Sequence, residues 1–268
     1  MPNFIIWEAL DGGMERDTTS RTLKTTATSI DVLRLLEEFN GARISELAEY
    51  MEMPKSTIHG HLATLRSKEF VLKRGDTYYL GPELLRLGNK VRTRREEYVL
   101  AREYTERLYE SVGFRSVFAT EMGGKAVFLH TASGNDMGWA HERLGNRLYL
   151  HDTAIGKAIL AELPRRRVER ILDEWGLPEE TENTITDRET LFAELESVRE
   201  QGYATNHEEN LPDLHGIGVA ATEQTGNVIG GFSVTGAEHS FTGENRERQL
   251  AEAITEIVNE FELELSLV

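Results

Sequence analysis

The chain has 268 residues, enough for one large or two ordinary domains, with 39% hydrophobic residues for globular cores and no cysteine, which excludes disulfides, thiolate metal sites and a cysteine nucleophile. No segment approaches the roughly 18 apolar residues of a membrane span, and no basic region precedes the apolar residues 4–7 as in a signal peptide, so we expect a cytoplasmic protein. The net charge of −16 argues against a broad, uniformly basic surface for nonspecific nucleic-acid binding.

The N-terminal segment differs from the rest of the chain. Residues 1–23 show no sustained periodicity and are polar after Trp7, so we predict a disordered tail in which Met14 is an alternative initiator. Apolar residues then recur at helical spacing between Val32 and Phe39, which predicts a first helix. Thr28 and Asp31, three residues apart, resemble its capping box.

Two short amphipathic helices and a hairpin come next. Residues 44–51 carry apolar side chains at i, i+3, i+4 and i+7, and residues 58–65 repeat the spacing after Pro54, which a first helical turn tolerates. A short strand-like segment then turns back at residues 74–76. This order predicts a winged helix-turn-helix DNA-binding domain over residues 24–90.

The outward side chains of the third helix are short donors and acceptors with one cation, and such groups fit base edges and phosphates in a major groove. Further cations flank the wing. For an isolated helix a solvated face is the simpler interpretation, but the wing and the order of elements favour DNA. The predicted DNA-binding residues are Lys55, Ser56, Thr57, His59, Gly60, Arg66, Lys73 and Arg74.

The segment from Val91 to Val112 has five basic and five acidic residues interleaved with apolar ones. This pattern predicts one long exposed helix that links two domains and pairs between subunits. The alternative is a single solvated helix with no partner.

The second half of the chain, residues 113–268, predicts an α+β domain with a largely antiparallel sheet. Strand-like runs flank residues 122–124 and form a hairpin, and further strands are expected over residues 216–221 and 227–235. Helical spacing marks residues 153–163, 164–175, 188–201 and 244–261.

Charge is divided unevenly between the two halves. Residues 1–112 hold 17 Lys and Arg against 18 Asp and Glu, whereas residues 113–268 hold 13 against 28. The half predicted to bind DNA is therefore nearly neutral, and the acidic charge lies in the other. With 23 Arg against only 7 Lys, this composition suggests a halophilic protein, for which counterion release contributes little to DNA affinity.

Several segments together carry a family likeness. TSIDVLRLLEE, ISELAEYMEMPKSTIHGHLATL and YYLGPELLRLG resemble the DNA-binding domain of the IclR family of transcriptional regulators. LYLHDTAIGKAILAELP, GYATNHEEN and GNVIGGFSVTG resemble segments of its effector domain. The resemblance covers Lys24 to the C-terminus. It implies a winged helix joined through a linker helix to a GAF-like effector domain, in dimers or tetramers that bind small organic metabolites and repress or activate.

The resemblance also implies an effector site. Ala154 and Ile155 open a helix whose free backbone N–H groups suit an anion, and Ser233 and Thr235 make one strand face polar. The alternative for these hydroxyls is bonding to the neighbouring backbone. The implied effector-binding residues are Leu148, Leu150, Ala154, Ile155, Asn206, His207, Gly216, Ser233 and Thr235.

The chain departs from the family pattern at three places. Gly60 replaces a residue that is usually basic, His61 replaces a usual leucine, and Gly218–Ala220 replaces an Ala-Ala-Pro strand. Phosphate contacts should therefore depend more on the cations at both ends of the third helix and on the wing. The edge of the effector site is expected to differ as well.

Two other functions compete with regulation. Several residues suit acid–base or metal chemistry, but helical HExxH spacing, G-x-S-x-G and a P-loop are all missing, so we predict no catalytic residue, metal or cofactor. A ligand-independent architectural DNA binder would have no use for the acidic second domain. We expect a regulator that binds a palindromic operator as a dimer or a dimer of dimers and is switched by an organic acid or sugar-derived metabolite. The residues considered for catalysis are His130, His141, His151, Glu208 and Glu209.

Overall fold

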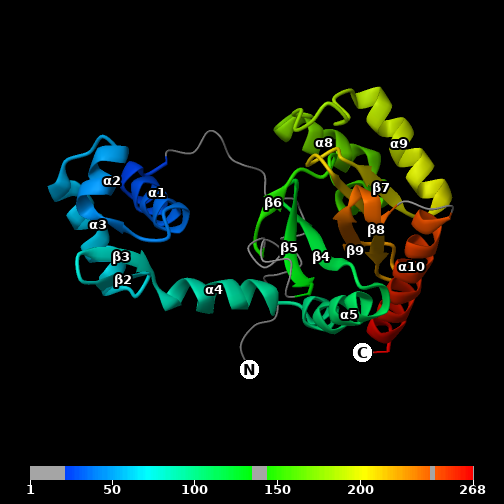
Figure 1. Ribbon diagram of the computed structural model, residues 1–268, viewed down its shortest axis with the longest axis horizontal. Helices are drawn as coiled ribbons and strands as arrows, with labels where there is room; N and C mark the ends of the chain where they lie inside the picture. Colours follow the sequence, from blue (N-terminus) through cyan, green and yellow to red (C-terminus); the bar gives the residue numbers. More distant parts are fainter. Residues whose placement is uncertain (1–21, 135–143, 242–244, 268) are drawn as a thin grey trace. The chain divides into compact units, whose positions relative to one another are not determined.

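The computed structural model describes residues 22–134, 144–241 and 245–267, which form two compact units divided between Arg94 and Arg95 (Figure 1). The disordered tail predicted over residues 1–23 lies almost wholly outside the described residues. A search of the described helices for one both long and apolar enough to span a bilayer finds none.

The first unit is the predicted winged helix-turn-helix. Its three-stranded antiparallel sheet has the order β1-β3-β2, and the predicted wing is the β2–β3 hairpin, which turns at Gly75 with a φ of +58°. The apolar stripes of the first three helices meet in one core, in which Val32, Leu47 and Leu62 are fully buried. The elements are α1 (Lys24–Glu38), β1 (Ala42–Arg43), α2 (Ile44–Tyr50), α3 (Lys55–Ser67), β2 (Val71–Arg74), β3 (Thr77–Leu80) and α4 (Pro82–Arg92).

The predicted capping box at the start of α1 is wrong. The helix begins four residues earlier, at Lys24, because the polar residues before Thr28 continue the helical turn. The Thr28 hydroxyl donates back to the Lys24 carbonyl at 2.9 Å instead of capping the helix. Asp31 pairs along the surface with Arg34.

Gly81 fixes the end of the wing. Its N–H donates to the Phe70 carbonyl at 2.8 Å, and a Cβ at this position would lie 2.1 Å from the Glu69 carbonyl oxygen. Only glycine fits such a close backbone approach. Pro82 then opens α4 at a position where a missing N–H costs nothing.

The structure differs from the single exposed helix predicted over Val91–Val112. Helix α4 ends at Arg92, and α5 (Glu96–Val112) begins after a break in which Arg95 is extended. Two glutamates in the first turn favour this new N-terminus. One side of α5 is buried in the second unit, with Tyr98 and Leu108 at 2% and 0% exposure, so α5 is part of that unit's core and not a solvated linker.

The second unit is the predicted α+β domain. Its six-stranded sheet has the order β6-β5-β4-β9-β8-β7 with antiparallel neighbours, and the predicted hairpin between β4 and β5 turns through Gly123 and Gly124, both at positive φ. The short strands β6 and β7 were not predicted. The remaining elements are β4 (Arg115–Met122), β5 (Lys125–Ala132), β6 (Arg147–Leu148), α7 (Ala154–Glu162), α8 (Arg165–Trp175), α9 (Arg188–Gln201), β7 (Ala204–His207), β8 (Leu214–Thr222), β9 (Val228–Ala237), the 3-10 turn η2 (Glu238–Ser240) and α10 (Arg246–Leu265).

Helices cover both faces of this sheet (Figure 1). Strand residues alternate between two cores: Phe118 packs with α5 and α10, whereas Val117 and Ala119 pack with α7, α8 and α9. On the first face, Phe118, Phe232 and Phe261 pack with ring centroids 4.9 to 6.1 Å apart. Because the sheet is covered on both faces, residues of both strand faces are buried over most of β4 and β5.

Candidate functional site

The predicted DNA-binding residues form one exposed surface on the first unit. Seven of the eight are exposed and Thr57 is half-buried, while Ile58 and Leu62 of the same helix point into the core. The Lys73 ammonium lies 5.4 Å from the centre of the Tyr78 ring, so this cation of the wing makes a cation–π contact within the hairpin.

The two departures on α3 have different physical origins. A Cβ added at Gly60 would meet no atom within 4 Å, so packing does not require glycine on this outward face. His61 faces inward, and its Nδ1 lies 2.8 Å from the Ser29 hydroxyl, which joins α3 to α1 by a hydrogen bond where an apolar contact would otherwise serve. Gly60 therefore changes the surface, whereas His61 changes the internal packing.

In the second unit, a cavity of about 30 Å³ lies where the first turn of α7 meets the sheet. Thr153 caps this helix by accepting from the Gly156 N–H at 3.2 Å. A Cβ at Gly218 would lie 2.6 Å from the Ile155 nitrogen, so the helix rests directly on the backbone of β8. The cavity is lined by Arg115, Phe128, Leu148, Thr153, Ala154, Ile155, Asn206, Asn210, Leu214, His215, Gly216, Ser233 and Thr235.

The structure brings seven of the nine predicted effector residues to this cavity and leaves out Leu150 and His207. Leu150 packs in the core under α7. His207 lies one position beyond the cavity residue Asn206 on β7, and side chains one position apart on a strand point to opposite faces of a sheet. The seven residues are Leu148, Ala154, Ile155, Asn206, Gly216, Ser233 and Thr235.

The most informative residue that the sequence reasoning missed is Arg115. It is 2% exposed and lies opposite Thr235 in the β4–β9 pairing, and its Nη1 donates to the Thr235 hydroxyl at 3.2 Å. The guanidinium also lies 5.6 Å from the centre of the Phe128 ring. It places a permanent positive charge in the cavity lining. An arginine directly before the run of residues 116–120 that the sequence marks as a strand could have indicated this position.

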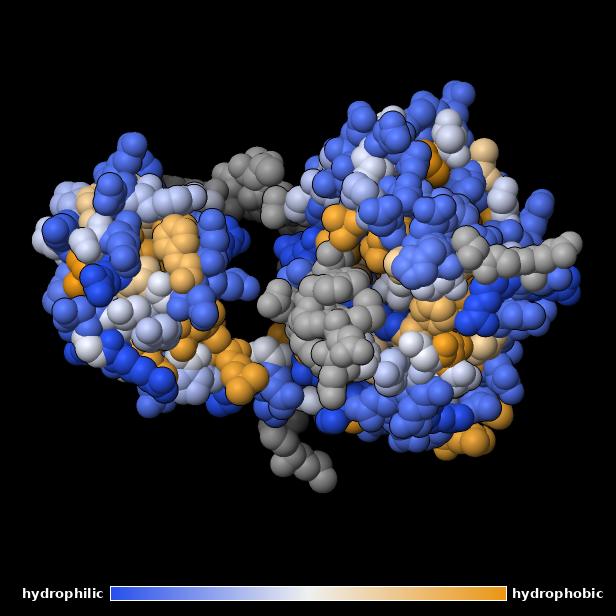
Figure 2. Space-filling model, viewed as in Figure 1, coloured by the Kyte–Doolittle hydropathy of each residue, from blue (hydrophilic) through white to orange (hydrophobic). Residues whose placement is uncertain are grey.

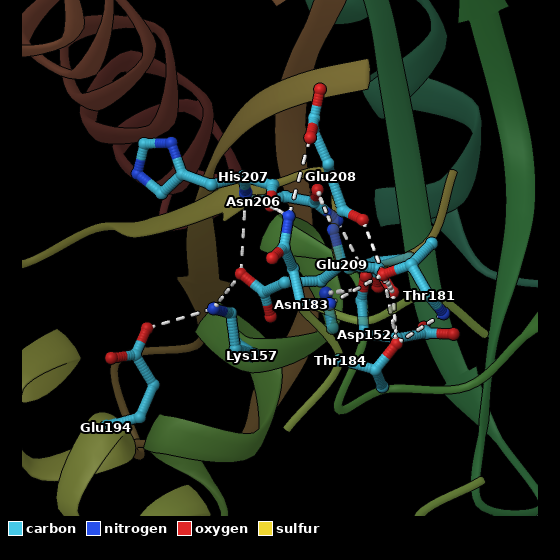
Figure 3. Close-up of polar contacts among 12 residues, drawn as sticks. Asp152, Lys157, Thr181, Asn183, Thr184, Glu194, Asn206, His207, Glu208 and Glu209 are labelled. Atoms are coloured by element: carbon cyan, nitrogen blue, oxygen red, sulfur yellow. Dashed lines mark hydrogen bonds and ion pairs between the residues drawn. The ribbon is translucent and has the colours of Figure 1, made fainter. Parts of the chain in front are cut away.

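A polar network holds the segment after β7 beneath α7 (Figure 3). The Asn206 amide donates to the Asp152 carbonyl at 2.6 Å and its oxygen accepts from the Glu209 N–H at 3.2 Å. The hydroxyls of Thr181 and Thr184 donate to the Glu209 carbonyl. These bonds fix the side chain of Asn206 at the cavity.

Lys157, from the second turn of α7, contacts the same segment. It is 1% exposed, and its ammonium binds Glu209 at 2.7 Å and Glu194 at 2.9 Å (Figure 3). A buried charge is retained only when it is paired, so this cation and Glu209 depend on each other. The pairing connects α7, α9 and the segment after β7.

The residues considered for catalysis serve other purposes. Glu209 neutralises Lys157, and His130 Nε2 lies 2.6 Å from the Tyr98 carbonyl. Burial lowers the pKa of His151, whose Nε2 lies 3.1 Å from the Pro178 carbonyl. His141 lies outside the described residues. In the described parts of the chain these groups do not converge on one cavity.

Asp152 precedes the cap of α7 and is fully buried. Burial raises the pKa of its carboxyl to about 7; a hydrogen bond from Asn210 opposes the shift, and the negative charge of Glu180 adds to it. The other carboxyl oxygen, Oδ1, has no hydrogen-bond partner among the described residues. A neutral carboxylic acid therefore fits this position better than a carboxylate.

This pKa predicts a pH-dependent stability. Between about pH 4 and 7 the folded protein keeps the Asp152 proton that the unfolded chain has lost, so stability should fall as pH rises, by at most about 4 kcal/mol in total. Asp152→Asn should remove this slope and be more stable than the parent at pH 8, as measured by urea unfolding at several pH values. Asp187→Asn is the control, because the lowered pKa of that exposed cap leaves it ionised in both states above pH 5. A parental slope in Asp152→Asn would contradict the assignment.

Comparisons with known proteins agree with this architecture. Residues 28–75 match the family model of the IclR helix-turn-helix domain, and residues 93–262 match that of the bacterial transcriptional regulator IclR C-terminal domain. The "Probable HTH-type transcriptional regulator ArcR" of Halobacterium salinarum is 32% identical over 232 residues, which are 85% of this chain and 86% of that protein.

Solved structures agree as well. The crystal structure of the Thermotoga maritima IclR superposes with a TM-score of 0.78 at 27% identity, covering 91% of this chain and 99% of that one. An IclR homologue from Microbacterium hydrocarbonoxydans, crystallised in complex with 4-hydroxybenzoate, has a TM-score of 0.70 at 22% identity and covers 85% of this chain and 92% of its own. The chain belongs to the IclR family of transcriptional regulators, and it is a regulator with a helix-turn-helix DNA-binding domain.

Proposed function

We propose that this regulator reads a palindromic operator through α3 and the wing, and that a small organic acid bound in the cavity of the second unit switches it. The relatives are named transcriptional regulators, and we infer that this chain also acts without catalysis, in the cytoplasm where its DNA lies. The observation that carries the effector proposal is the buried Arg115 in a cavity whose other lining residues are His215 and hydroxyl, amide and apolar residues.

The DNA surface separates two kinds of contact. Ser56 and Thr57 lie in the first turn of α3, where short side chains reach base edges, while Lys73 and Arg74 end the first strand of the wing, where cations meet phosphates. The acidic residues lie mostly in the other half of the chain, so this surface is free of most of the net negative charge.

Substitutions at these two groups of residues should therefore have different effects on DNA binding. Ser56→Ala should relax base preference by about 1–3 kcal/mol, whereas Lys73→Ala should weaken all DNA about equally. Gly60→Arg should tighten binding, because the added cation meets open space on the outward face of α3. Fluorescence anisotropy with operator and scrambled duplexes at fixed KCl measures both effects. Equal losses on both duplexes for Ser56→Ala would contradict base reading.

The cavity suits a carboxylate with a compact carbon skeleton. Arg115 supplies a charge-assisted donor, the first turn of α7 supplies a helix N-terminus, and Ser233 and Thr235 add hydroxyls. Phe128 and Ile155 offer apolar surface for the carbon atoms. The volume of about 30 Å³ holds one or two waters, so binding of an organic acid requires the lining to open. The related complex with 4-hydroxybenzoate, an aromatic carboxylate, supports this ligand class.

A panel of small carboxylates that includes 4-hydroxybenzoate tests this site by calorimetry and by operator binding. For any acid that binds, Arg115→Met should weaken the affinity about tenfold to a hundredfold, because a charged hydrogen bond contributes about 1.5–3 kcal/mol. The double variant Ser233→Ala with Thr235→Val should also lose the response while still binding DNA.

Ser116→Ala is the matched control, because this hydroxyl is equally buried but follows Arg115 on β4 and faces the other side of the sheet. An unchanged ligand response in the Ser233/Thr235 double variant would place the effector elsewhere. Operator binding with no saturable response to any acid of the panel would favour the ligand-independent alternative.

We propose that α4 forms the dimer contact that the sequence placed at Val91–Val112. No residue of α4 is buried within its unit, and Leu84, Leu87 and Val91 recur at helical spacing along it. Figure 2 shows a hydrophobic patch over this helix. Two winged helices held by a two-fold axis would double the base pairs read, as a palindromic operator requires.

Leu87→Glu should therefore shift the protein toward monomer and weaken operator binding more than half-site binding. Light scattering in molar KCl, across micromolar protein concentrations, measures the mass. Asn89→Glu adds the same charge to the opposite side of α4 and should leave the mass unchanged. A wild-type monomer under these conditions would contradict the proposal.

A further inference from the structure

Two histidines lie directly opposite each other at the edge of the second unit's sheet. His207 on β7 pairs with His215 on β8 in the antiparallel register, and their rings meet edge to face with centroids 4.9 Å apart. Directly opposite residues of antiparallel strands have Cβ atoms about 4.5–5.5 Å apart on one face of the sheet. Both imidazoles therefore project from the same side of the sheet, opposite to Asn206, and His215 also borders the cavity.

A carboxylate reaches the same place from a third element. Glu247 lies in the first turn of α10, and its Oε1 is 3.7 Å from His207 Nε2. One ligand atom from each of the three residues lies within 4.8 Å of the other two. The side chains of His207 and Glu247 are 50% and 40% exposed, so the hydrophobic core does not require this arrangement.

We propose that His207, His215 and Glu247 bind a divalent transition-metal ion, with zinc as the best fit. Two imidazole nitrogens and one carboxylate are a ligand set that zinc uses with a water in the fourth position. Ligand atoms around zinc at about 2.0–2.1 Å lie roughly 3.4 Å apart, so atoms that now lie within 4.8 Å of one another need to approach by at most about 1.4 Å. Half-exposed side chains reach that by small rotations. Magnesium and calcium prefer oxygen ligands and fit this set poorly.

The charge around these residues favours a cation. Glu208 adjoins His207, and its carboxylate lies with those of Asp213 and Glu238 in a second group of acidic side chains. The unit as a whole carries most of the net negative charge of the chain. This negative potential raises the local concentration of a divalent ion without itself supplying nitrogen ligands.

A bound ion would join the hydrogen-bonded pair of strands β7 and β8 to the start of α10. It would fix β7 and β8 to the start of α10, directly beyond Asn206 and Gly216, which line the cavity on the opposite face. Metal occupancy would therefore stiffen the edge of the effector site. Metal binding itself requires neither DNA nor effector. A test of the metal site is therefore independent of the proposed regulation.

The test uses the full-length chain without a polyhistidine tag, titrated with zinc in calorimetry and with cobalt in visible spectroscopy. We expect one zinc per chain, and cobalt should give the absorption bands of a four-coordinate site with nitrogen ligands. Zinc should also raise the midpoint of thermal unfolding. His207→Gln is the main variant because its side chain is exposed and its loss leaves the fold intact; it should weaken zinc binding at least about tenfold.

Glu247→Gln should weaken binding similarly, while Glu252→Gln on the exposed side of α10 is the matched control and should bind like the parent. His59→Gln in the first unit controls for binding by unrelated exposed histidines. Stoichiometric zinc binding that survives both His207→Gln and Glu247→Gln would overturn this assignment. So would the lack of any saturable zinc or cobalt binding at 100 µM, a concentration at which even a weak site with a Kd of about 10 µM would be filled.

Discussion

The second unit depends on the close approach of α7 to the backbone of β8. Glycine at position 218 allows the Ile155 nitrogen to lie where a Cβ would otherwise stand, and Gly156 makes a similar approach to the Leu150 carbonyl. This contact brings the helix N-terminus against the sheet and creates the cavity between them. It also places Lys157 in the interior, where its positive charge is retained because the ammonium pairs with Glu194 and Glu209. The cavity and the buried ion pair therefore both follow from the contact between α7 and the backbone of β8.

Two buried ionisable residues, one basic and one acidic, lie near the contact between α7 and β8. Arg115 brings a cation into the cavity lining, whereas burial raises the pKa of Asp152, just before the α7 cap, to about 7, so that this carboxyl is neutral below that pH. A unit with 28 acidic residues over positions 113–268 thereby presents a positive group at its interior site. If the cavity binds an organic acid as proposed, the local placement of charge, and not the net charge of the unit, would set the ligand class.

In the first unit, the residues that pack the core are constrained, whereas those on the outward face of α3 are not. Its core uses the apolar stripes of three helices, and Gly81 fixes how the wing returns to them. The outward face of α3 has no comparable constraint, since Gly60 meets open space. His61, in contrast, is tied to Ser29 and belongs to the packing. Exposed positions of α3, through which we propose that the operator is read, can therefore change without altering the fold.

The sequence by itself determined the features that depend on local spacing. Helical periodicity located the helices around Ile58 and Leu191, glycine and charge marked the turns at Gly75 and Gly124, and the exposed face of α3 followed from its buried one. Tertiary structure decided the features that depend on pairing between distant segments. The strand register placed Arg115 beside Thr235 and turned His207 away from Asn206. The packing of α5 against α10 placed α5 in the core of the second unit, and the approach of α7 to the segment after β7 paired Lys157 with Glu209. Local patterns cannot specify these contacts, because a one-residue shift in register or a different helix partner would leave the same local signals unchanged.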